Sequence, residues 1–113
     1  MLNIDELTVK EIKHIQSLLR GGEKQETPYQ VGKNYFVKLV THYLTGKLIR
    51  VTPKELVMID VAWIADTGRY MEFLRDGKIN EVEPYPDGQE VILGRGALID
   101  ATEWKHALPR AQK

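Results

Sequence analysis

The sequence has no cysteine among its 113 residues. A chain without cysteine forms no disulfide, offers no thiolate to a metal ion and has no cysteine nucleophile. It also has no apolar run approaching the roughly 18 residues that a membrane-spanning helix needs, and its first residues do not resemble a signal peptide. We therefore expect a cytoplasmic protein that has no membrane partner.

Signatures of catalysis are also missing. The histidines His14, His42 and His106 are far apart in the sequence and do not have the spacing of a metal-binding helix. No G-x-S-x-G nucleophile elbow is present, and the stretch "GRGALI" lacks the third glycine of a dinucleotide-binding loop. We predict a protein that is not an enzyme and that uses no cofactor and no metal ion.

Acidic residues are missing from one part of the chain, although the net charge of the whole chain is zero. Residues 28–54 contain five basic residues and no acidic residue, whereas residues 55–90 contain three basic and nine acidic residues. This asymmetry indicates one positive and one negative face, and the alternative is chance segregation on a solvated surface.

The N-terminal residues have the pattern of an amphipathic helix. Thr8 and Glu11 form a capping box, and the apolar residues that follow recur at helical spacing until Gly21 and Gly22. We predict a helix over residues 1–20 and a linker over 21–30. The helix would pack on its own domain or on a neighbouring subunit, and the sequence does not separate these alternatives.

From Val31 the apolar period changes to two, which is typical of strands. The pattern predicts a strand of about ten residues from Asn34, a glycine turn at 44–47 and a returning strand at 47–51. A turn at 52–55 and a buried strand at 56–64 follow. The remaining predicted segments are a helix at about 66–76 capped by Asp66, a strand fragment broken by Pro84 and Pro86, and a last hairpin around Gly94-Arg95-Gly96. The predicted fold is mainly β (α+β). It is a small, partly open antiparallel β-barrel of about five strands, residues 31–113, with an N-terminal helix and one inserted helix.

Two resemblances extend this prediction. The stretches "VGKNYFVKLVTHYLTGKLIRVT", "DVAWIADTGRY", "NEVEPYPDG", "GRGALIDATEW" and "HALPRAQK" resemble an uncharacterised family of small proteins encoded by tailed phages and prophages. The overall layout is similar to Sm-like (SH3-like) small barrels, with Gly46 matching the turn that opens a bent strand and Arg95-Gly96 matching a step that lines an RNA pocket. Thr52 departs from that pattern, which has aspartate at this place, and so does the inserted helix.

Recognition of an anion is the strongest chemical signal in the sequence. Arg95 lies between two glycines, where backbone N–H groups and a guanidinium can approach a phosphate together. Basic and aromatic residues elsewhere can bind phosphate or stack on a base. The predicted ligand-binding residues are Arg95, Arg69, Arg110, Lys38, His42, Tyr35, Tyr43, Trp104 and His106. Structural roles are the alternative for several of them: Arg69 in a salt bridge, Arg95 at a hairpin tip and Trp104 in the core.

These observations and the phage resemblance lead to three hypotheses. The first is a homo-oligomeric phage protein that captures a small phosphate-bearing nucleotide, acting in the host cytoplasm as an anti-defence sponge for a cyclic-nucleotide or cyclic-ADP-ribose type signal. The second is a structural or assembly protein of the phage particle, with the N-terminal helix as its docking element. The third is an Sm-like RNA-binding protein that uses the acid-free segment 28–54.

Overall fold

The computed structural model describes residues 27–113. The helix predicted over residues 1–20, and the part of the predicted linker before residue 27, lie outside the described residues. The described elements are β1 (Asn34–Leu39), β2 (Tyr43–Val51), β3 (Glu55–Asp66), α2 (Tyr70–Asp76), β4 (Glu81–Pro84), β5 (Val91–Gly94), the 3₁₀ turn η1 (Arg95–Ala97) and β6 (Leu98–Glu103). This order confirms the prediction of a mainly β fold with a helix after the third strand. Every pairing between the described strands is antiparallel, as predicted.

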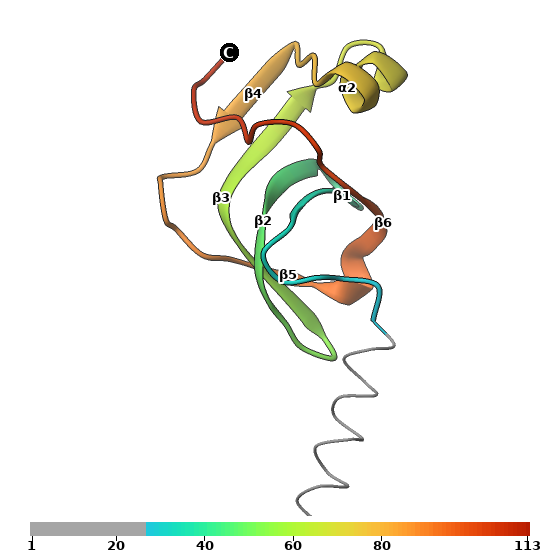
Figure 1. The fold of residues 1–113 in the computed structure, drawn as a ribbon, viewed down its shortest axis with the longest axis vertical. Helices are drawn as coiled ribbons and strands as arrows, with labels where there is room; N and C mark the ends of the chain where they lie inside the picture. Colours follow the sequence, from blue (N-terminus) through green and yellow to red (C-terminus); the bar gives the residue numbers. More distant parts are fainter. Residues whose placement is uncertain (1–26) are drawn as a thin grey trace, which may run out of the picture.

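The strands form one open sheet in the order β4-β3-β2-β1-β6, with β5 also paired to β3. The long strand β3 pairs with β2 along one edge, and it pairs with β4 and β5 at opposite ends of its other edge (Figure 1). This confirms that residues 56–64 form a central strand. Among the described residues no pairing joins β6 to β4 or β5. The structure therefore has six strands in an open sheet and not the predicted barrel of about five.

A bulge in β3 changes which residues face each side of the sheet. Thr45 of β2 pairs with Ala62, but Lys47 pairs with Ile59, so β3 carries one extra residue in this interval. The irregularity includes Asp60, whose φ is 52°. An extra residue reverses the alternation of side chains along a strand. Leu56 and Met58 before the bulge and Val61 after it therefore face the same side of the sheet, and Ala62 and Ile64 face the other side.

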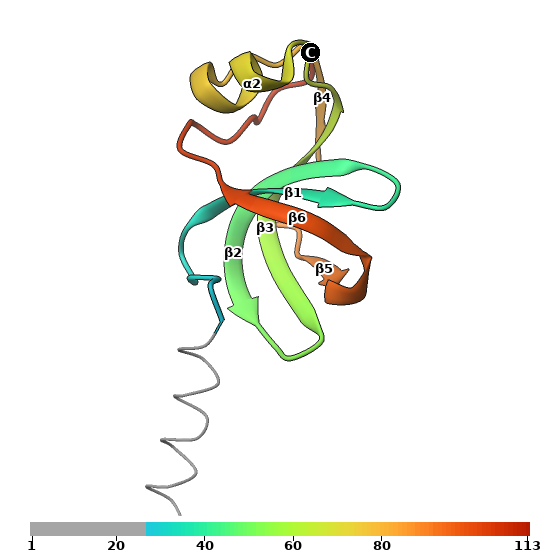
Figure 2. The ribbon, with the colours of Figure 1, turned by 90° about the vertical axis from the view of Figure 1, so that its right-hand side faces the viewer.

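Each face of the sheet buries its own apolar cluster. The first cluster joins the inner face of β1, β2, β3 and β5, and its buried members are Tyr35, Val37, Leu39, Leu44, Leu48, Leu56, Met58, Val61 and Leu93. The second lies under α2, and its buried members are Phe36, Ala62, Ile64, Phe73, Val82 and Trp104. Figure 2 shows α2 above β1 and β6. Phe73 of α2 is a buried member of the second cluster. Two opposed clusters explain the nearly continuous apolar sequence of β3.

Three predicted segments differ from the structure. The first hairpin turns at residues 40–42, where the Leu39 N–H donates to the His42 carbonyl, and not at 44–47. Gly46 lies inside β2, where an added Cβ would be 2.9 Å from Val61 Cγ2, so glycine is present for close packing and not for a turn. The last hairpin is absent from the described chain, because β5 pairs with β3 and β6 pairs with β1.

The inserted helix begins later than predicted. Asp66 is the last residue of β3, and its carboxylate accepts a hydrogen bond from the Gly68 N–H at 2.8 Å. Arg69 occupies the N-cap position of α2, and its side chain makes no capping hydrogen bond. The carboxylate of Asp66 therefore orders the turn that leads into the helix and does not cap it.

Candidate functional site

Two of the donors of Arg95 are used within the fold. Its guanidinium Nη1 donates to the Thr52 carbonyl at 2.8 Å, and its backbone N–H donates to the Lys54 carbonyl at 2.8 Å. The guanidinium carbon also lies 5.4 Å from the centroid of the Tyr29 ring, within the range of a cation–π interaction. Arg95 thus joins the β5–β6 connection to the β2–β3 turn and to the chain before β1.

Arg110 has a comparable role at another part of the sheet. Its Nη2 donates to the Tyr85 carbonyl at 2.8 Å, and its Nη1 donates to the Val61 carbonyl at 3.3 Å. Both Nε and Nη2 also donate to Asp87 Oδ1, which completes an ion pair. These bonds hold the C-terminal segment against β3 and the chain that follows β4, so the charge of Arg110 is already compensated.

The predicted aromatic residues are divided between the core and the surface. Tyr35 and Trp104 are buried, with exposed fractions of 8% and 3%. The Tyr35 hydroxyl accepts a hydrogen bond from the Gln30 N–H, and the Trp104 indole donates to the Ala107 carbonyl. His106 packs edge-on against Trp104, and its Nε2 lies 2.8 Å from the Leu74 carbonyl oxygen. The contacts of these three side chains are those of core residues.

Lys38, Tyr43 and Tyr70 do lie together, as a predicted basic and aromatic group would. The Lys38 ammonium is 4.4 Å from the centroid of the Tyr70 ring and 6.0 Å from that of Tyr43, and it forms an ion pair of 3.6 Å with Asp100. The Tyr70 side chain, and to a smaller degree the Asp100 carboxylate, raise the pKa of Lys38. The Lys38 ammonium group is thus already in contact with groups of the fold itself. Arg69 has an exposed side chain and directly precedes Tyr70 at the start of α2.

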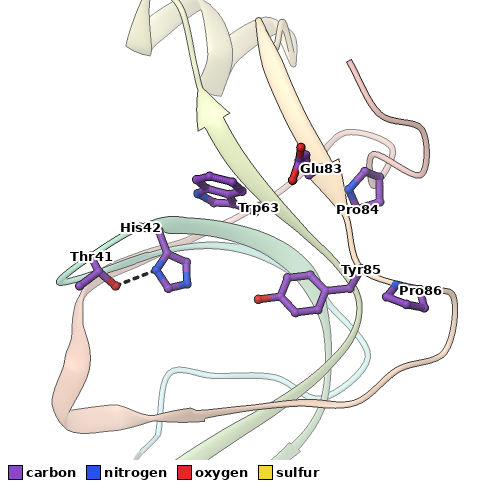
Figure 3. A pocket seen from close by; sticks show the side chains of 7 residues that line it. All are labelled: Thr41, His42, Trp63, Glu83, Pro84, Tyr85 and Pro86. Atoms are coloured by element: carbon purple, nitrogen blue, oxygen red, sulfur yellow. Dashed lines mark hydrogen bonds between the residues drawn. The ribbon is translucent and has the colours of Figure 1, made fainter.

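The remaining predicted residue, His42, borders a groove of about 540 Å³. Its lining residues come from the β1–β2 turn, β3, β4 and the chain after β4; they are Thr41, His42, Trp63, Glu83, Pro84, Tyr85 and Pro86. Figure 3 shows the rings of His42, Trp63 and Tyr85 bordering the same opening, with the hydrogen bond of 2.7 Å between Thr41 Oγ1 and His42 Nδ1. We call this set of residues the aromatic groove.

The walls of the aromatic groove are held by backbone hydrogen bonds. The Tyr85 N–H donates to the Val61 carbonyl at 2.7 Å, and the Tyr85 carbonyl accepts from Arg110. The Gly88 N–H donates to Asp60 Oδ1 at 3.3 Å, which joins the chain after Tyr85 to the bulge in β3. A wall held from both sides keeps its shape before a ligand arrives, which lowers the entropic cost of binding. Arg110 is therefore a positioning residue for this groove.

Trp63, Tyr85 and Glu83 are the groove residues that the sequence did not single out. Trp63 is 41% exposed although it stands in the apolar run of β3. The apolar pattern of this run does not indicate that Trp63 is exposed. The prolines Pro84 and Pro86 are a usable signal, because proline cannot donate a ladder hydrogen bond and so marks the end of a strand.

Other classes of site find no support in residues 27–113. In this part of the chain no group of three or more histidine, cysteine, aspartate or glutamate residues is placed to bind a metal ion. None of the described helices has the length and apolar character to span a bilayer. Comparison with models of known protein families, with curated proteins and with solved structures found no match.

Proposed function

We propose that this chain is a non-enzymatic, phage-type assembly protein that binds another protein, and that the aromatic groove is where a segment of that partner docks. The observation that carries the proposal is the exposed Trp63 ring in a hollow shared with His42, Tyr85 and two prolines. Concave sites lined by aromatic rings are typical of binding surfaces, and tryptophan and tyrosine contribute much of the free energy of protein association. The fixed backbone around Tyr85 supports a site that exists before binding.

Charge favours a protein segment over a nucleotide as the occupant. The groove contains the carboxylate of Glu83, and the guanidinium groups of Arg95 and Arg110 donate to backbone carbonyls or to Asp87. A phosphate in the groove would meet a like charge without a free guanidinium among its lining residues. Nucleotide capture and RNA binding remain predictions, with the stacking capacity of the groove rings as their support. Assembly into a homo-oligomer and a location in the host cytoplasm likewise remain predictions.

The proposal is tested by selecting peptides on the whole protein. A random-peptide display library is panned on the unmodified chain, on Trp63→Ala and on Met71→Ala. Met71 is 65% exposed on α2, away from the groove, and serves as the matched control for the loss of an exposed apolar side chain. We expect enriched peptides on the unmodified chain and on Met71→Ala, and none on Trp63→Ala.

Two results would contradict the proposal. One is enrichment that is equal on all three proteins or absent from all of them. The other is a rise in melting temperature with a cyclic nucleotide, or with oligo-U or oligo-A RNA, that Trp63→Ala abolishes, because that would identify the groove as a nucleotide or RNA site. Melting each variant provides the control for folding, because a single cooperative transition distinguishes a loss of binding from a loss of structure.

A further inference from the structure

We infer that the aromatic groove selects a positively charged side chain, an arginine or a lysine of the bound segment, which lies between the Trp63 ring and the Glu83 carboxylate. This inference rests on the proposed function and names the chemistry that the docking segment must carry. It assigns to Glu83 the role of a specificity-determining residue.

The pairing of β3 with β4 places the two groups side by side. Trp63 and Glu83 are direct cross-strand partners in the β3–β4 ladder. Side chains of directly opposed residues in an antiparallel pair point to the same face, with Cβ atoms about 4.5–5.5 Å apart. Both side chains line the groove, as Figure 3 shows. The groove therefore presents an aromatic face and a carboxylate within reach of one cation.

The Glu83 carboxylate is available to such a ligand. It is exposed, and within residues 27–113 it takes part in no ion pair or side-chain hydrogen bond. Arg110, which bonds to the groove wall at Tyr85, is itself paired with Asp87. An exposed carboxylate without a cation partner beside a tryptophan ring attracts a guanidinium or ammonium group through both charge and cation–π interaction.

Other carboxylates lie near Glu83 along the chain, although one of them, Asp87, is paired with Arg110. The chain that forms β4 and the loop after it, residues 81–90, contains four acidic residues and no basic residue. Asp60 adds a further carboxylate where it bonds to the Gly88 N–H. A surface of one sign attracts a ligand of opposite sign and repels one of the same sign. The negative face expected from the uneven charge of residues 55–90 stays a prediction.

The inference is tested with short random-peptide libraries whose central residue is fixed as arginine, leucine or glutamate. Each pool is titrated against the whole protein, with binding followed by fluorescence polarisation. We expect the arginine pool to bind the unmodified chain about five-fold more tightly than the leucine pool, as one exposed cation–π contact and ion pair predict. The glutamate pool should bind most weakly, and added salt should reduce the difference between the pools.

Charge reversal provides the decisive comparison. In Glu83→Lys the preference should reverse, so that the glutamate pool binds more tightly than the arginine pool. Glu81→Lys makes the same change of charge on the same strand, at an exposed position that does not line the groove, and should keep the arginine preference. Glu83→Gln, which alters no shape, should bring the arginine and leucine pools to equal affinity, and it replaces Glu83→Lys if that variant is unfolded.

The outcomes separate this inference from the function on which it rests. If all pools bind the unmodified chain equally and Trp63→Ala abolishes that binding, the inference about the cation is wrong and the proposed function stands. If Glu81→Lys and Glu83→Lys weaken the arginine pool equally, the selection comes from the general field, and the role assigned to Glu83 is refuted. If no pool binds, the proposed function itself is wrong.

Discussion

The buried hydroxyl of Thr45 allows a quantitative test of the fold. Thr45 lies in β2, is fully buried, and its Oγ1 has no hydrogen-bond partner within the described part of the chain. A buried hydroxyl without a partner costs about 1–3 kcal/mol. Valine has nearly the same shape, replaces the hydroxyl by a methyl group and suits a strand at least as well. We therefore expect Thr45→Val to raise the free energy of unfolding by about 1–2 kcal/mol.

For a domain of this size a change of 1 kcal/mol corresponds to a shift of about 4–8 °C in melting temperature, so the expected rise is about 5 °C or more. The assay is thermal and urea denaturation followed by circular dichroism. Thr102→Val is the matched control, because Thr102 is also a direct register partner of Phe36 but is exposed. Its effect should stay within about 0.5 kcal/mol. A loss of stability in Thr45→Val would show that the hydroxyl has a partner and would refute the reasoning.

Two further predictions concern other parts of the fold. Gly77→Ala should lower the free energy of unfolding by more than Gly88→Ala, by about 1 kcal/mol or more in a urea titration. Both glycines have φ of 74°, but only at Gly77 would an added Cβ meet a neighbour, His106 Cγ at 2.8 Å; equal losses would contradict this. Lys38→Gln should be destabilising at neutral pH, and the difference from the unmodified chain should shrink as pH rises past about 10.5, because the raised pKa of Lys38 stabilises the fold only while the ammonium is charged. Urea titrations at several pH values check this, and a difference that grows above pH 10.5 would contradict it.

The sequence predicted those elements whose signals are local. The turn at 52–55 follows from Pro53 in a polar segment, and the structure confirms it with a hydrogen bond from the Thr52 N–H to the Glu55 carbonyl. Gly46 shows where local signals fail. A glycine that permits a turn and a glycine that permits close packing look the same in a sequence, and only the position of Val61 across the β2–β3 ladder distinguishes them.

The candidate site was harder to predict because it depends on tertiary structure. Of the residues expected to bind a ligand, only His42 lines the aromatic groove. Trp63 lies in the apolar segment 56–64, which the sequence pattern predicts to be a buried strand. It is nevertheless 41% exposed in the structure, where it is the register partner of Leu44 on one side and of Glu83 on the other. The residues next to Trp63 in the sequence do not indicate this exposure.

The arginines show how one chemical property supports two opposite interpretations. A guanidinium has five N–H donors in a rigid plane, which suits a phosphate and suits carbonyl groups that no strand pairs. An open sheet joined by irregular connections leaves such carbonyls at Thr52 and Tyr85, and Arg95 and Arg110 bond to them. An unpaired carbonyl near the core costs free energy in every molecule, whereas a ligand contributes only when it is bound. In a small sheet with many connections, an arginine beside glycine or proline is therefore first a candidate for holding the fold.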